Sequence, residues 1–215
     1  MVGEPVTGIG VSRLHFPVTT LGPGRRAAIW LQGCSIHCPG CVSRDTWAPA
    51  ASLTEVAAVA DWIEDQADDG LTGITVSGGE PLDQPEQLGA LLTDLRRRPR
   101  TADKDVLLYT GYAYSAVARQ HRAVLSLVDA VISGPYIESR PSRHRWMGSS
   151  NQVLTLLTDR AREGFTDPAG SRQVQVSADG GKIWMIGIPD RGDLELLQAL
   201  LENRGVSLGD VSWRP

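Results

Sequence analysis

Residues 27–41 read Ala-Ala-Ile-Trp-Leu-Gln-Gly-Cys-Ser-Ile-His-Cys-Pro-Gly-Cys, an apolar run that leads directly into a cluster of cysteines. The run Ala27–Leu31 has the length and apolar character of a buried strand. The loop after it spaces Cys34, Cys38 and Cys41 as C-x3-C-x2-C, and the chain of 215 residues holds no other cysteine. An odd, tightly clustered set of thiols is a poor disulfide framework and indicates a metal or catalytic site.

The cysteine spacing leaves two kinds of metal site open. Three thiolates on one short loop can bind three corners of an iron–sulfur cluster, whereas clusters used only for electron transfer usually have four cysteine ligands. Because no fourth cysteine exists, one iron of such a cluster would remain open for a small molecule. The alternative is a zinc site made by Cys34, His37, Cys38 and Cys41, although structural zinc motifs usually form two separated pairs.

Strand and helix patterns alternate after the cysteine loop. Apolar segments at 71–76, 105–109, 128–132 and 152–157 predict strands, and helices are expected over about 53–63, 83–95 and 115–125. The first of these helices carries a capping box, Ser52 to Glu55, at its start. This alternation predicts an α/β fold with a parallel sheet built from right-handed crossovers.

Unusual turns follow the carboxyl ends of several predicted strands. They are the cysteine loop, the turn Ser77-Gly78-Gly79-Glu80-Pro81, the turn Thr110-Gly111-Tyr112 and the turn Ser133-Gly134-Pro135. The carboxyl ends of parallel strands form the edge at which active sites of α/β proteins assemble. These turns therefore predict one composite site.

The last quarter of the chain has a different pattern from the rest. Segments 173–176 and 182–188 predict a β-hairpin across Asp179-Gly180-Gly181, and a final helix is expected to begin at Asp193. We therefore expect a core over residues 1–163 and a C-terminal extension over residues 164–215, packed on the same domain.

Charge and hydropathy exclude some classes of partner. The net charge of −4 and the pI near 5.6 give no general bias toward nucleic acid or anionic membranes. No apolar run approaches the ~20 residues of a membrane span, and the N-terminal residues do not resemble a signal peptide, so a cytoplasmic protein is expected. The stretch Arg140–Trp146 is densely basic and could dock an acidic surface or lie in solvent, whereas Arg25 and Arg26 are expected on the surface.

The motifs follow one another in an order that resembles a known family. The spacing C-x3-C-x2-C after one strand and Gly78-Gly79-Glu80 after the next is similar to the radical S-adenosylmethionine superfamily. Further motifs make the chain similar to the small activating enzymes of anaerobic ribonucleotide reductase. They are Thr46-Trp47, Tyr109-Thr110-Gly111-Tyr112, Ser133-Gly134-Pro135 and Gly148-Ser149-Ser150-Asn151-Gln152.

This resemblance implies a fold, cofactors and a set of site residues. The fold would be an incomplete (β/α)6 barrel, open on one side, with the hairpin and helix of the C-terminal extension added. The cofactors would be a 4Fe–4S cluster and S-adenosylmethionine. Cys34, Cys38 and Cys41 would be the cluster ligands, and no catalytic residue is expected beyond cluster and cofactor. The residues expected to lie near S-adenosylmethionine are Ser77, Gly78, Gly79, Glu80, Gly111, Tyr112 and His37.

The resemblance also implies an activity. Reductive cleavage of S-adenosylmethionine would give a 5′-deoxyadenosyl radical, which would take a hydrogen from a glycine in a large glycyl radical protein. A flavodoxin- or ferredoxin-like protein would supply the electron. Two departures, Ser133 in place of the usual aspartate and a chain that continues well past Leu157, keep a peptide or small-molecule substrate as an alternative.

Overall fold

The computed structural model describes residues 7–166, 172–179, 182–190 and 192–213. Its strands are β1 Gly8–Ile9, β2 Val11–Val18, β3 Arg26–Leu31, β4 Thr54–Glu55, β5 Gly73–Gly78, β6 Asp105–Thr110, β7 Ala130–Ser133, β8 Val153–Leu156, β9 Val174–Asp179 and β10 Lys182–Gly187. Its helices are α1 Val56–Asp65, α2 Pro85–Arg97, α3 Tyr114–Gln120, α4 Arg122–Leu125, α5 Asp159–Gly164 and α6 Asp193–Glu202, with short 3-10 turns η1 Arg44–Thr46 and η2 Pro81–Asp83.

Six strands form the central sheet in the order β2-β3-β5-β6-β7-β8. The neighbouring strands β3, β5, β6 and β7 are parallel to one another, whereas β2 and β8 pair antiparallel at the two edges. The prediction of an all-parallel sheet is therefore wrong at β8. Residues 134–152 contain no helix, so the chain turns back at the same edge of the sheet, as antiparallel neighbours require.

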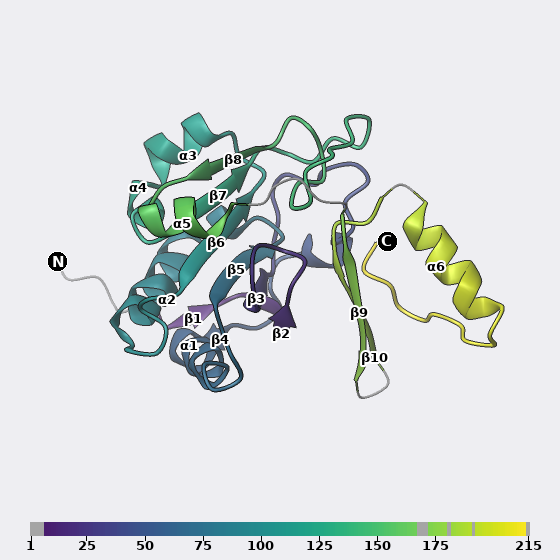
Figure 1. Ribbon diagram of the computed structural model, residues 1–215, viewed down its shortest axis with the longest axis horizontal. Helices are drawn as coiled ribbons and strands as arrows, with labels where there is room; N and C mark the ends of the chain where they lie inside the picture. Colours follow the sequence, from purple (N-terminus) through teal and green to yellow (C-terminus); the bar gives the residue numbers. More distant parts are fainter. Residues whose placement is uncertain (1–6, 167–171, 180–181, 191, 214–215) are drawn as a thin grey trace.

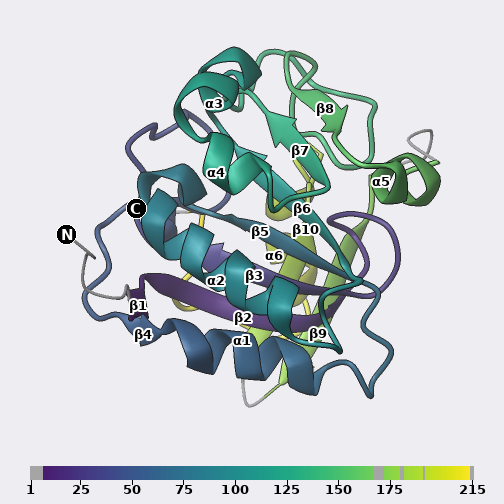
Figure 2. The same ribbon diagram turned by 90° about the vertical axis from the view of Figure 1, so that its left-hand side faces the viewer.

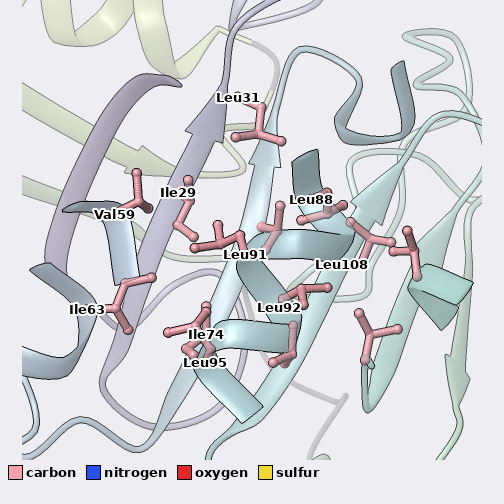
Figure 3. Close-up of a cluster of buried hydrophobic side chains, with 14 of the residues drawn as sticks. Ile29, Leu31, Val59, Ile63, Ile74, Leu88, Leu91, Leu92, Leu95 and Leu108 are labelled. Atoms are coloured by element: carbon pink, nitrogen blue, oxygen red, sulfur yellow. The ribbon is translucent and has the colours of Figure 1, made fainter. Parts of the chain in front are cut away.

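One face of the sheet is covered by α1 and α2, which lie in front of the strands in Figure 2. Inward-facing residues of β3, β5 and β6 alternate along each strand and meet the leucine face of α2, as Figure 3 shows for Leu91, Ile74 and Leu108. The predicted helical spacing of leucines is confirmed, because the four leucines of that face are all buried: Leu88, Leu91, Leu92 and Leu95.

The C-terminal extension covers part of the opposite face. The hairpin of β9 and β10 and helix α6 lie on the side of the sheet away from α1 and α2 (Figures 1 and 2). Ile186 of β10 is 3% exposed and packs in one cluster with Ala28 and Trp30 of β3. The predicted hairpin is confirmed, and Gly180 and Gly181 of its turn lie outside the described residues.

Two local predictions about helices differ from the structure. The capping box is wrong, because Thr54 and Glu55 pair with β1 instead and α1 begins at Val56 without a side-chain cap. The helix expected over 115–125 is divided into α3 and α4 at His121. The broader prediction of a mixed α/β fold holds.

Arg26 also differs from expectation, because it is fully buried rather than on the surface. Its guanidinium donates to the carboxylate of Asp105 at 2.6 Å, to Thr75 Oγ1 at 2.7 Å and to the carbonyl of Ile74 at 2.7 Å. A buried charge is tolerated when it is paired and hydrogen-bonded in this way. Arg26 thus ties β3, β5 and β6 together at the amino end of the sheet.

Candidate metal centre

The predicted turns meet at the carboxyl edge of the parallel strands. The cysteine loop leaves β3, Gly79 and Glu80 follow β5, and Gly111 and Tyr112 follow β6. The turn after β7 reaches the same edge, because β7 is parallel to β6. The structure therefore brings the sequence-predicted site residues to one place around the cysteine loop.

Gly78 and Gly79 allow the end of β5 to lie directly against the backbone of the cysteine loop. A Cβ on Gly79 would lie 2.0 Å from the carbonyl oxygen of Gly33, and one on Gly78 would lie 2.3 Å from the amide nitrogen of Leu31. Gly79 N–H donates to Leu31 O at 2.9 Å, and Glu80 N–H donates to Gly33 O at 2.8 Å. The glycine pair thus fixes the start of the loop that carries the thiols.

Glu80 is buried at this edge and connects β5 with β6. Its Oε1 accepts hydrogen bonds from Leu82 N–H at 2.9 Å and Thr110 Oγ1 at 2.8 Å, and its Oε2 accepts one from Gly111 N–H at 2.7 Å. Burial raises the pKa of this carboxyl to about 7, although the same hydrogen bonds act to lower it. A carboxylate has about four acceptor positions, so Glu80 can still accept from one more donor.

Asp83 holds the cysteine loop through Ser35 and also accepts a hydrogen bond from Tyr112. Asp83 accepts hydrogen bonds from Ser35 N–H at 2.7 Å and from Ser35 Oγ at 2.9 Å, and Tyr112 OH donates to Asp83 at 2.8 Å. The sequence predicts Asp83 only as the start of a helix and assigns no role to Ser35. The position of Asp83, three residues after Glu80 of the Gly-Gly-Glu turn, was the available signal, because that turn lies at the site edge.

The three thiols are half-buried and influence one another. Burial raises the pKa of Cys38 and of Cys41 above the ordinary value, and the neighbouring thiols add to the rise. Backbone N–H groups oppose it, from Tyr136 toward Cys38 and from Ser43 toward Cys41, the latter at 3.4 Å from the sulfur. Bound iron favours the thiolate form that metal ligation requires.

His37 and Trp47 form an aromatic stack beside the thiols. Their ring centroids lie 4.7 Å apart at 24°, and the Arg44 guanidinium lies 5.0 Å from the Trp47 ring. The Trp47 indole is close enough to the Cys41 thiol to lower its pKa, yet its buried Nε1 makes no full hydrogen bond to any residue that the structure describes. The role of His37 beside S-adenosylmethionine stays a prediction.

These residues suit a cluster better than a single ion. In the described part of the chain no three His, Cys, Asp or Glu side chains converge closely enough to hold one metal ion. A cluster instead needs thiolates at separate corners, and hydrogen bonds to its sulfurs tune it. The unpartnered Trp47 N–H beside Cys41 can supply such a bond.

The loop 134–152 lies beside the cysteine loop at the same edge. Asn151 donates to Pro135 O at 2.8 Å, and Gln152 accepts from Gly148 N–H at 2.8 Å, so both residues tie this loop down. Of the basic stretch, Trp146 is buried against Phe165, with ring centroids 5.3 Å apart, whereas Arg140 and Arg143 are exposed.

No helix among the described residues has both the length and the apolar character to cross a bilayer. A family model described as "4Fe-4S single cluster domain" matches residues 20–155, which include every site residue named above.

Relatives of known name match the same region. The anaerobic ribonucleoside-triphosphate reductase-activating protein of Vibrio cholerae is 30% identical over 150 residues, covering 96% of that protein and 67% of this chain. The protein of the same name from Escherichia coli K12 is 30% identical over 149 residues, covering 96% of that protein and 66% of this chain. The one from Enterobacteria phage T4 is 32% identical over 141 residues, covering 88% of that protein and 64% of this chain.

These comparisons confirm the family expected from the motifs. The two cofactors are therefore those that the resemblance implies, a 4Fe–4S cluster and S-adenosylmethionine. The enzyme class is also the implied one, a radical oxidoreductase. The chain therefore belongs to the 4Fe-4S single cluster domain family and is a relative of the anaerobic ribonucleoside-triphosphate reductase-activating proteins.

Proposed function

We propose that this protein activates a large glycyl radical protein, of the kind represented by anaerobic ribonucleotide reductase. The observation that carries the proposal is the three-cysteine loop, held at the carboxyl edge of the sheet in a chain without a fourth cysteine. The names of the relatives support the activating role. We also propose that the open sheet is the incomplete (β/α)6 barrel of the superfamily, and that the protein works in the cytoplasm.

The chain's own residues would bind and orient the two cofactors. Cys34, Cys38 and Cys41 would hold three irons, and the fourth iron would remain open for the amino and carboxylate groups of S-adenosylmethionine. The remaining acceptor position on Glu80 suits that ammonium group. Gly78 and Gly79 would keep the backbone close to the methionine part.

When bound, the cluster and S-adenosylmethionine together would supply radical chemistry that removes a hydrogen atom from a glycine. The protein contributes position and exclusion of water rather than acid–base chemistry, because the radical step needs no proton transfer. Asp83, Ser35 and Tyr112 would keep the ligand loop in place during this step. A flavodoxin- or ferredoxin-like protein would donate the electron.

Anoxic reconstitution with iron and sulfide tests the proposal. The loaded protein, given a strong reductant and the glycyl radical partner encoded by the same genome, should form 5′-deoxyadenosine, methionine and a glycyl radical visible by electron paramagnetic resonance. Absence of the partner's radical, despite 5′-deoxyadenosine formation, would contradict the activating role.

The cluster ligands give the first testable prediction. Cys34→Ala, Cys38→Ala and Cys41→Ala should each lose most of the bound iron and sulfide, because the cluster then keeps only two protein ligands. His37→Ala is the matched control, since a zinc site would need that imidazole and a cluster would not. Iron and sulfide analysis decides the matter, and loss of metal in His37→Ala equal to that in Cys38→Ala would overturn the ligand assignment.

A second candidate is direct action on a peptide or small molecule. It is favoured by the extension, because the match leaves about a third of this chain without a counterpart in the named relatives. Loss of deuterium from a deuterated metabolite in the same assay, with no partner protein present, would support this second function.

A further inference from the structure

The indole of Trp47 is a buried donor beside a predicted cluster ligand. Its Nε1 is shielded from solvent and makes no full hydrogen bond to any residue that the structure describes. Water therefore cannot satisfy this N–H, and its acceptor must come from the chain or from a group that the chain holds. Burial raises the pKa of the Cys41 thiol and the Trp47 indole opposes that rise, so the indole N–H lies next to this sulfur.

The backbone around Trp47 is tied to the start of the cysteine loop. Cys34 N–H donates to Trp47 O at 3.2 Å, and Gly33 N–H donates to Thr46 O at 2.8 Å. Trp47 N–H in turn donates to Arg44 O at 3.1 Å and closes the turn η1. Trp47 is thus held at a fixed place relative to the first thiol.

Two side chains orient the indole ring. The His37 ring stacks on it, with centroids 4.7 Å apart and planes at 24°, and the Arg44 guanidinium lies 5.0 Å from the ring centroid. An aromatic stack and a cation–π contact both depend on the direction of the ring face. These contacts therefore restrain the direction of the indole N–H as well.

The C-terminal extension restrains the segment between Cys41 and Trp47. Asp45 N–H donates to Ser212 O at 3.2 Å, and Ser212 Oγ donates to Val42 O at 3.0 Å. Because both bonds fall between the third thiol and the indole, they limit how far the two groups can move apart.

We propose that Trp47 Nε1–H donates a hydrogen bond to Cys41 Sγ when the cluster is bound, and that this bond raises the reduction potential of the cluster. A neutral thiol is a weak acceptor, whereas a thiolate on iron is charged and accepts more strongly. Iron ligation therefore supplies the acceptor that the indole lacks.

The direction of the effect follows from charge. Reduction adds one electron to the cluster, from the donor protein in the cell or from dithionite in a test, and Trp47 keeps its proton throughout. A donor aimed at a cluster sulfur stabilises the more negative, reduced state, and such bonds are among the factors that set cluster potentials. Trp47 would thus make the cluster easier to reduce.

Removing the N–H alone tests this role. 3-Benzothienylalanine has the shape of tryptophan with sulfur in place of the indole N–H, and stop-codon suppression introduces it at position 47. The cluster-loaded protein, without S-adenosylmethionine, is equilibrated at set potentials, and electron paramagnetic resonance measures the reduced cluster. At a fixed potential the ratio of reduced to oxidised cluster should fall about tenfold, which is about 59 mV for one electron. An unchanged ratio would overturn the proposal.

Two further proteins separate tuning from support of the fold. Trp47→Phe keeps an aromatic ring without the N–H and should shift the ratio in the same direction. 3-Benzothienylalanine at position 62 is the matched control and should change the ratio less than twofold, because Trp62 packs against the main core from α1. Loss of iron and sulfide from the position-47 analogue would show that Trp47 only supports the loop, and the tuning role would be wrong.

A second measurement detects the bond itself. Electron–nuclear double resonance of the reduced cluster in H₂O and in D₂O should show one exchangeable proton fewer in the position-47 analogue than in the unmodified protein. An identical set of exchangeable protons in the two proteins would contradict a bond from Trp47.

The inference rests on the ligand role proposed for Cys41 and needs no partner protein. A normal glycyl radical with an unchanged potential in the analogue would overturn the role of Trp47 alone. A shifted potential in the analogue, with no glycyl radical formed by the unmodified protein, would overturn the proposed function alone.

Discussion

Gly79 lies where the backbones of β5 and the cysteine loop come closest, and no side chain fits there. We expect Gly79→Ala to destabilise the protein by at least about 2 kcal/mol, because its Cβ would stand 2.0 Å from Gly33 O and the backbone must move. Gly89→Ala in the middle of α2 is the control, since nothing lies within 4 Å of its Cβ. It should stabilise the helix by about 0.5–1 kcal/mol. Denaturant unfolding measures both, and equal effects would contradict the close approach.

Glu80 should make stability depend on pH. Its pKa is raised from 4.5 to about 7 in the folded protein, so the folded state binds more protons than the unfolded state between these values. Stability should therefore fall as pH rises from about 4.5 to about 7, by on the order of 3 kcal/mol from this group. Glu80→Gln should flatten that slope in urea unfolding of the apo protein. An unchanged slope in the variant would show that Glu80 is not the source.

Single residues were the hardest part of the site to predict. The thiols and the glycine pair follow from spacing, because the chemistry and the tight turn demand those residue types. The role of Asp83 and the burial of Arg26 do not follow from spacing, since each depends on contacts between segments far apart in the sequence. Arg26 meets Asp105 across 79 positions, and Ser35 meets Asp83 across 48.

At the scale of elements, the turn η2 joins the end of β5 to the cysteine loop through Asp83. Asp83→Ala removes the acceptor of three hydrogen bonds, two from Ser35 and one from Tyr112. We expect the cluster of this variant to be lost to a chelator about fivefold faster, because its loop is less restrained. The cluster's visible absorbance under anoxic conditions reports the rate. Asp103→Ala, an exposed residue paired only with Lys104 in the described part of the chain, should match the unmodified protein.

The elements themselves were largely predictable where their periodicity was strong. The leucines of α2 and the apolar runs of β3, β5 and β6 match expectation, since each buries one face or both faces against the core. β2 was missed because its residues are mostly half-buried and because Pro17, which argues against a strand, interrupts the alternation of Leu14, Phe16 and Val18.

For the molecule as a whole, the extension is held by packing on the sheet face opposite α1 and α2. Ile186→Ala should therefore cost about 2–5 kcal/mol and make the extension sensitive to limited proteolysis. Ile183 lies on the other face of the same strand and is 42% exposed, so Ile183→Ala should change stability by less than about 0.5 kcal/mol. Equal protease sensitivity in both variants would contradict this packing.

The sequence did not reveal which face of the sheet the β9–β10 hairpin and α6 cover. The hairpin and the last helix were visible as patterns, but their docking depends on which face of β10 meets β3. That choice is decided by Trp184 and Ile186, which pack with Ala28 and Trp30, and no spacing rule reveals it.

The bond between Ser212 and Val42 joins positions 170 residues apart and restrains the segment just after the last cysteine. During synthesis that restraint can form only after residue 212 has left the ribosome, long after all three thiols have emerged. The segment after Cys41 therefore gains this restraint late. A cluster delivered to the nascent chain would bind a loop that still lacks the hydrogen bond from Ser212.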